Sequence, residues 1–320
     1  MNRFISMKFT TPVSIPAALA PITYNDTLLT FGSCFAENIG ERLTRYGFDI
    51  DVNPFGILYN PLSIAGAIQH LLSGNPFVED DLFLHNGLWH SFAHHGSFSA
   101  TTTDEAMQKI KDRLLPASAR LTTCNHLMIT FGTAWVYRLQ GSDGVVANCH
   151  KLPEKQFTRG RLSVEEIVAC WQPLLARLKA VNPPIRLLFT VSPIRHWRDG
   201  AHENQLSKAT LLLAIEQLQK QCDADYFPAY ELMMDELRDY RFYAADMLHP
   251  SDVAVDYLWE RFSDTRFDAA TRAAMHEVEQ INKALAHRPL NPDTDEYRRF
   301  NAQTRERIET LQRQYPNIRL

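Results

Sequence analysis

Short apolar runs alternate with helical patterns along the first two thirds of the chain. Runs of mostly apolar residues predict five strands, at residues 27–31, 48–52, 127–131, 186–191 and 225–227. Between them, apolar residues recur at helical spacing over 37–46, 62–72, 164–181 and 205–221. Alternating strands and helices are typical of a parallel sheet that is covered by helices on both faces. The pattern therefore predicts an α/β fold.

Two segments depart from this alternation. Residues 75–103 are rich in aromatic residues, histidine and glycine, and Asn86-Gly87 is a strong signal for a hairpin turn. We expect a β-rich insertion here, either a lid over the edge of the sheet or a hairpin whose aromatic side chains complete the core. Residues 267–320 predict a helical extension that ends in a heavily charged surface helix. Because no linker or repeat is visible, residues 1–320 are expected to form one domain.

The composition excludes several classes of function. The 320 residues are 45% hydrophobic and 22% charged, with a formal net charge of -4 that gives no reason to expect nucleic acid or an anionic membrane as partner. Five separated cysteines without a C-x-x-C pair favour reduced thiols over a disulfide framework or a zinc site. The start of the chain lacks the apolar core of a signal peptide, and no segment is long enough to span a bilayer. The expected location is the cytoplasm.

A Gly-Ser-Cys tripeptide lies where the first predicted strand turns into the first predicted helix. Small nucleophilic side chains at such a turn lie at the positive end of the helix dipole, which favours a thiolate or an oxyanion. In the plainer alternative, Gly32 makes the turn, Ser33 caps the helix and Cys34 fills a small apolar gap. Parallel sheets bind ligands beyond the carboxyl ends of their strands. The tripeptide is therefore expected on one rim with residues 132–133 and 192–193, which follow two other strands.

A second candidate feature stands late in the chain, where Asp246 precedes His249 by three residues. Residues at this spacing in a single turn share a face. A carboxylate there can hold the tautomer of the imidazole, whose outer nitrogen is then free to take a proton from a nucleophile. The pair is weak evidence alone, and it becomes informative beside a nucleophile at the end of the first strand.

The sequence resembles the GSCFA family, which is placed in the SGNH (GDSL-like) hydrolase superfamily. The resemblance rests on FGSCFA and extends through NPFGILYNP, LWHSFAHHG, NCHKLPEKQF, TVSPIRHWRDG and ADMLHPS. It implies a flavodoxin-like three-layer α/β/α sandwich around a five-stranded parallel sheet, in agreement with the strand pattern. It also implies hydrolase or acyltransferase chemistry on an ester, thioester or amide, without indicating a substrate.

The superfamily roles can be carried over to the matching positions. The first block of GDSL-type enzymes has its nucleophile two residues after the glycine, which assigns that role to Cys34. Ser33 is the competing nucleophile if the turn is wound one residue differently. His249 would take the proton and Asp246 would orient His249. Such a covalent acyl-enzyme scheme requires no cofactor. The alternative function is a non-catalytic binding module that keeps the pocket but not the turnover.

This chain matches the superfamily less well at the residues that donate hydrogen bonds to the oxyanion. The second block contributes a glycine N–H, and Gly56 resembles that glycine, although a plain turn after Pro54 also explains it. Gly132 begins the third block, but this chain lacks the asparagine donor that the superfamily has there. A lost donor of this type costs roughly two to three orders of magnitude in rate. Candidate replacement donors are Asn148, His150 and Asn60. Asn60 has the alternative role of capping the helix that follows it.

Candidate substrate-binding residues come from the same rim, and they are Trp135, His150, Arg195 and His196. Arg195 and His196, with Arg198, would bind an acidic group or else form a solvated loop. Lys208, on the next helix, is expected to face solvent. The histidines of 75–103 have no carboxylate beside them in a ligand pattern, so no metal site is expected. The expected partner is a small molecule or an acyl-bearing substrate.

Overall fold

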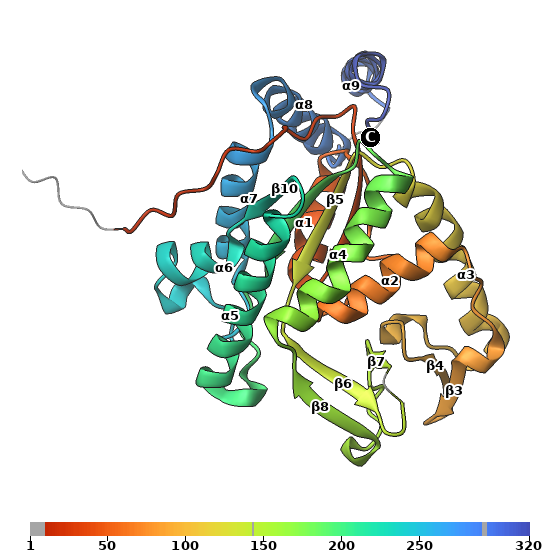
Figure 1. The fold of residues 1–320 in the computed structure, drawn as a ribbon. Coiled ribbons are helices and arrows are strands. Elements are labelled where there is room, and N and C mark those ends of the chain that lie inside the picture. The colour runs from red at the N-terminus through yellow and green to blue at the C-terminus, as the bar shows by residue number, and fades with distance from the viewer. Residues whose placement is uncertain (1–9, 143, 290–292) are drawn as a thin grey trace, which may run out of the picture.

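A five-stranded parallel sheet forms the centre of the computed structural model, which describes residues 10–142, 144–289 and 293–320 (Figure 1). The strands are β1 (Thr27–Gly32), β2 (Asp49–Val52), β5 (His126–Phe131), β9 (Arg186–Val191) and β10 (Ala224–Phe227). Their order in the sheet is β10-β9-β5-β1-β2, and every neighbouring pair is parallel. All five predicted strands are confirmed, with bounds that agree within one residue.

The order of the strands creates a point where the direction of the chain reverses. From β1 the chain moves outward to β2, and it then returns past β1 to build the other three strands. Counted in chain order, this is the 2-1-3-4-5 arrangement of flavodoxin-like folds. Right-handed crossovers on either side of the reversal place their helices on opposite faces. The reversal lies between β1 and β5, and open parallel sheets bind ligands at such a point.

Helices cover both faces of the sheet, as predicted. One face carries α2 (Pro61–Ser73), α3 (Thr103–Leu121), α4 (Val164–Val181) and α5 (Gly200–Gln219). The other face carries α1 (Cys34–Arg45), α7 (Asp252–Arg266) and α8 (Ala269–Leu285), with α9 (Asp295–Gln314) packed on α8. The predicted helical extension is thus confirmed for its described part, and residues 290–292 lie outside the description. No helix in the described ranges is long and apolar enough to cross a bilayer.

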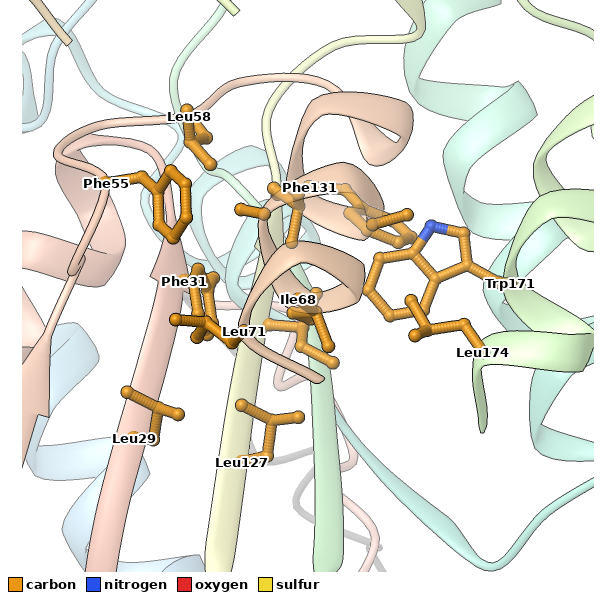
Figure 2. Packing of buried hydrophobic residues seen from close by; sticks show 14 of the residues in the cluster. Leu29, Phe31, Phe55, Leu58, Ile68, Leu71, Leu127, Phe131, Trp171 and Leu174 are labelled. Carbon is orange, nitrogen blue, oxygen red and sulfur yellow. The ribbon is translucent and has the colours of Figure 1, made fainter. Parts of the chain in front are cut away.

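Side chains of the central strands alternate between two cores. On β1, Leu29 and Phe31 pack in the core beneath α2 and α4, whereas Leu28 packs in the core beneath α1. Figure 2 shows the first of these cores, in which Trp171 of α4 meets Phe131 of β5 edge to face at a centroid distance of 5.2 Å. Burial on both faces explains why these strands are near-continuous apolar runs in the sequence.

The sequence pattern does not predict α3. Many of its positions carry charged or polar residues, and Pro116 lies in its interior, where proline removes a backbone donor. Thr102 caps the helix by accepting a hydrogen bond from the N–H of Glu105. Its buried side includes Met107 and Ile110, which belong to the core beneath α2 and α4. Burial of this apolar side, which needs the finished sheet, stabilises a helix of weak intrinsic propensity.

Two small antiparallel sheets lie beside the main one (Figure 1). Strands β3 (Leu82–His85) and β4 (Leu88–Ser91) form the predicted hairpin, and Asn86 and Gly87 have φ values of 50° and 75°. Such a turn is typical of type I′. Strands β6 (Trp135–Leu139), β7 (Val145–Val146) and β8 (Phe157–Arg161) form a second sheet that the sequence pattern does not predict. The N–H of Ala147, which follows β7, donates to the carbonyl of Phe92, which follows β4, at 2.8 Å. This hydrogen bond connects the segments that carry the two small sheets.

His94 of the insertion packs as a neutral ring. His94 is buried, stacks on Phe55 at a centroid distance of 4.7 Å and contacts Ser91 Oγ through Nδ1 at 2.9 Å. Burial lowers the pKa of His94 to about 3. In the part of the chain that the structure describes, no three histidine, cysteine or acidic residues are grouped so as to hold a metal ion.

His94 should make the stability of the folded protein decrease at acidic pH. An unfolded histidine titrates near 6.5 and folded His94 near 3, so the unfolded state binds more protons between these values. Stability should then fall as pH drops from 6.5 toward 3, by up to about 1.4 kcal/mol per pH unit. We expect His94→Gln to lower the melting temperature at pH 7.5 but to flatten its decline between pH 6.5 and 4.5. His276→Gln, at an exposed position, should keep the wild-type slope, and an unchanged slope in His94→Gln would contradict the assignment.

Candidate functional site

The backbone of Gly32 ends β1 and begins the turn into α1. A Cβ at this position would lie 2.5 Å from the Thr130 carbonyl oxygen of β5, so only glycine fits. The Gly32 N–H donates to Asn53 Oδ1 at 2.9 Å, and the Gly32 carbonyl accepts from the N–H of Leu58 at 3.0 Å. The first residue of the tripeptide thus connects the strand end to the segment that follows β2.

The next two residues lie in different environments. Ser33 is 2% exposed and caps α1, as the plainer alternative predicted, with Oγ accepting from the N–H of Phe35 at 3.4 Å. Cys34 is the first residue of α1 and is half-buried. A backbone N–H at this position has no acceptor within the helix, and the helix dipole is positive there. Of the two candidate nucleophiles, the thiol is the more accessible.

A pocket of about 510 Å³ lies at the carboxyl ends of β1, β5 and β9. Of the predicted site residues, it is lined by Ser33, Cys34, Asn60, Trp135, Asn148, Arg195, His196, Arg198 and His249. Trp135 lies beneath the guanidinium of Arg159, which is 4.2 Å from the ring centroid. As the rule for the carboxyl ends of parallel strands predicts, these residues come together at one pocket.

Asp246 and His249 form a closed unit in an exposed loop before α7. Asp246 Oδ1 accepts the N–H groups of Leu248 and His249, both at 2.9 Å, and Oδ2 lies 2.5 Å from His249 Nδ1. These N–H groups, followed by the imidazole, lower the pKa of Asp246 to about 2. The carboxylate is therefore ionised at neutral pH and holds Nδ1, which leaves Nε2 free. His249 lines the pocket, whereas Asp246 does not and lines an adjoining one.

The two predicted glycine donors do not fit an oxyanion hole. The N–H of Gly56 donates to the Asn53 carbonyl and the N–H of Gly132 donates to the Tyr59 carbonyl, each at 2.7 Å. A backbone N–H that already donates within the protein is not free for a ligand. Gly56 has a φ of 73°, and a Cβ there would lie 2.4 Å from Cβ of His95. Glycine at 56 is thus required by a turn and by close packing of the insertion.

The candidate replacement donors have three different environments. Asn148 lines the pocket, and its Oδ1 accepts from the N–H of His150 at 2.8 Å. His150 does not line the pocket, because its ring is buried and Nε2 bonds the Ser91 carbonyl at 2.8 Å. Its predicted roles as donor and substrate ligand therefore do not fit. Asn60 caps α2 through a bond from the N–H of Ser63 at 2.8 Å, which confirms the alternative given for it.

Tyr59 lines the pocket, although no role was predicted for it from the segment NPFGILYNP that contains it. Its carbonyl accepts the N–H groups of Gly132 at 2.7 Å and Thr133 at 3.0 Å, which anchors this segment to the end of β5. Its hydroxyl interacts with the thiol of Cys34, and its ring stands edge-on to the ring of His196, at a centroid distance of 5.7 Å. Burial, followed by the interaction with Cys34, raises the pKa of Tyr59 to about 12. The phenol therefore keeps its proton and remains a donor.

Lys208 lies beneath the pocket, contrary to the expectation that it faces solvent. It is 1% exposed, and Nζ donates to the carbonyls of Gly132 at 2.7 Å and Ser192 at 2.8 Å, at the ends of β5 and β9. Burial lowers the pKa of Lys208 to about 7. Burial, with a contribution from Lys208, also lowers the pKa of His196 to about 4. His196 is therefore neutral and offers a ligand a hydrogen bond rather than a charge.

The insertion contributes one side chain to the pocket. Among its described residues His95 lines the pocket, whereas His90 and His94 are buried elsewhere. Trp89 exchanges backbone hydrogen bonds with Ala100 and packs against the core beneath α2 and α4. The insertion is thus mainly a hairpin whose aromatic side chains complete a core, with His95 as its one contact to the site.

Comparison with known proteins places the chain in a family. The model of the GSCFA family matches residues 27–262, and that of the GSCFA domain protein, C-terminal domain, matches residues 278–320. Similar solved structures include a carbohydrate esterase family 3 protein from Talaromyces cellulolyticus, with 8% identity over 79% of this chain and 97% of that one and a TM-score of 0.32. Another is an acetyl xylan esterase (Est2A) from the rumen bacterium Butyrivibrio proteoclasticus, with 10% identity over 79% and 66% and a TM-score of 0.36. No protein with a curated description matches the sequence. Since the first family model spans well over half of the residues, the chain belongs to the GSCFA family.

Proposed function

We propose that the protein transfers an acyl group through a thioester on Cys34, as a hydrolase or acyltransferase acting on an ester, thioester or amide. One observation carries the proposal. The thiol at the start of α1 and the imidazole that Asp246 holds line the same pocket. A nucleophile facing an imidazole that a carboxylate orients is the arrangement that covalent acyl transfer requires.

The proposed reaction has two halves. In the first, Nε2 of His249 takes the thiol proton, the sulfur bonds the carbonyl carbon and the carbonyl oxygen becomes negative. As the bond to the leaving group breaks, His249 returns the proton to that group. In the second, water or another nucleophile attacks the thioester and gives its proton to His249, the carbon–sulfur bond breaks, and His249 returns the proton to the sulfur. Asp246 stays ionised and keeps the imidazole oriented throughout.

The negative oxygen needs donors, and we propose the Tyr59 hydroxyl and the backbone N–H of Cys34. The oxygen forms next to the sulfur, and Tyr59 lines the same pocket as Cys34 and interacts with it, so the hydroxyl is a candidate donor to this oxygen. The N–H of Cys34 is at the first position of α1, where the helix supplies no acceptor. This pair would take the place of the predicted Gly56 donor and of the asparagine donor that the superfamily has and this chain lacks.

A non-catalytic binding module is the second candidate function. It is favoured by one observation, which is that the N–H groups of Gly56 and Gly132 are both engaged within the protein. If Tyr59 and Cys34 do not suffice as donors, the pocket would bind an acyl compound without turning it over. The following experiments separate the two candidates.

Removal of the nucleophile or the base should abolish turnover. With p-nitrophenyl acetate and an acetyl thioester as probes, we expect Cys34→Ala and His249→Gln each to lower kcat by roughly 10³-fold or more. Ser33→Ala should retain most activity and lose about 1 kcal/mol of stability, because only a helix cap is removed. Mass spectrometry should detect the acyl group on Cys34. Equal turnover above background in wild type and Cys34→Ala would shift the nucleophile to Ser33, and no turnover by wild type would favour the binding module.

Cys34 should be the most reactive thiol of the protein. Burial raises the pKa of each of the other four cysteines, Cys124, Cys149, Cys170 and Cys222. Only thiolates react quickly with iodoacetamide. At pH 7.5 we expect Cys34 to be alkylated first and to be protected by a bound probe, as followed by peptide mass spectrometry. Slower labelling of Cys34 than of Cys149 or Cys170 would contradict this expectation.

Loss of the phenol hydroxyl should affect turnover more than binding. We expect Tyr59→Phe to lower kcat about 10²- to 10³-fold with little change in KM, because the hydroxyl acts on charge that exists only during the reaction. Tyr137→Phe is the control, since Tyr137 lines the same pocket but its hydroxyl accepts from Arg198 at 2.7 Å. An unchanged kcat in Tyr59→Phe would remove Tyr59 from the oxyanion hole without affecting the roles of Cys34 and His249.

A further inference from the structure

A second pocket, of about 580 Å³, adjoins the first. Arg195, Trp197 and Leu248 line both pockets and so form the wall between them. Trp197, Tyr240 and Met247 expose apolar and aromatic surface on the side of the second pocket. A molecule bound beside Cys34 can therefore extend past this wall and contact that surface.

Arg195 is the arginine of this wall, and its charge has no acidic partner among the described residues. Its Nη2 lies 3.0 Å from the sulfur of Met234, which is a weak acceptor, and its buried Nε has no acceptor in the part of the chain that is described. The other arginines of the two pockets pair as Arg159–Asp199, Arg198–Glu154 and Arg238–Asp235. A guanidinium N–H that is buried without an acceptor is destabilising, and an incoming oxygen would satisfy it.

The carboxylates that line the two pockets already have partners. Asp199 binds Arg159 with both oxygens, and Asp246 binds His249. Asp239, in the second pocket, accepts the N–H of Arg241 at 2.9 Å. In the first pocket the charge of Arg159 is balanced by Asp199, so the positive charge of Arg195 remains available to a ligand there.

We propose, building on the acyl transfer proposed above, that Arg195 binds an anionic group of the substrate, either a carboxylate or a phosphate. A guanidinium presents parallel N–H groups that match the oxygens of both anions. The neighbouring His196 is neutral and adds a hydrogen bond but no charge. The anionic group lies beside the Cys34–His249 pair, and the rest of the molecule extends past Trp197 into the second pocket.

Binding to Cys34→Ala tests this proposal, because that variant does not consume the ligand even if the proposed chemistry occurs. The probes are monomethyl succinate for a carboxylate, methyl phosphate for a phosphate, and dimethyl succinate as the neutral analogue, measured by calorimetry. We expect one anion to bind in a saturable and salt-sensitive way, and the better of the two identifies the group. Adding Arg195→Met should weaken that binding about 10- to 100-fold, and Arg195→Lys should weaken it less.

Arg241→Met is the matched control, because Arg241 is exposed, lies close by and lines neither pocket. It removes the same charge and should leave anion binding unchanged, and melting temperatures check that each variant folds. The proposal is overturned if Arg195→Met binds the anion as tightly as its parent, if dimethyl succinate binds equally well, or if neither anion binds. If anion binding depends on Arg195 but the wild-type protein shows no turnover, the proposed acyl transfer is contradicted and the anion site is not.

Discussion

The close contact of Gly32 with β5 is the constraint on which the site depends. Its Cα lies against Thr130, where no Cβ fits, while Asn53 and Leu58 hold its N–H and carbonyl. Leu58 directly precedes Tyr59 in the chain, so the contact that ends β1 also determines where the phenol stands relative to the thiol. A displacement of about 1 Å at a reacting group can cost two orders of magnitude in rate. One glycine therefore sets the position of both the proposed nucleophile and its proposed donor.

The sheet and its rim could be predicted from the sequence because each strand is marked by its own run of apolar residues. Strands buried on both faces are near-continuous apolar runs, and parallel strands end at the same edge, so the tripeptide was expected near the loops after β5 and β9. Helix α3 could not be predicted in this way. Pro116 and a charged surface weaken its pattern, and the helix is stabilised by burial of Met107 and Ile110 against a sheet that the sequence alone does not display.

The roles of the residues around the thiol could be predicted only in part, because they depend on hydrogen-bond partners that the sequence does not display. Lys208 is polar and lies on a helix, which by itself indicates solvent exposure, yet it bonds the carbonyls that end β5 and β9. Gly56 matches a donor motif, but its N–H is used in a turn with Asn53. In both cases the residue type is visible in the sequence, whereas its hydrogen-bond partner becomes known only when the chain is folded.

The loop that carries His249 is bonded mainly to itself. Asp246 binds the ring and two N–H groups of the same turn, and the Ala244 N–H donates to the His249 carbonyl at 2.8 Å. Cys34, by contrast, belongs to a helix that is packed on the sheet. A displacement of the loop therefore carries carboxylate and imidazole together as a rigid body. It alters the distance between the imidazole and the thiol, while the hydrogen bonds between Asp246 and His249 are preserved.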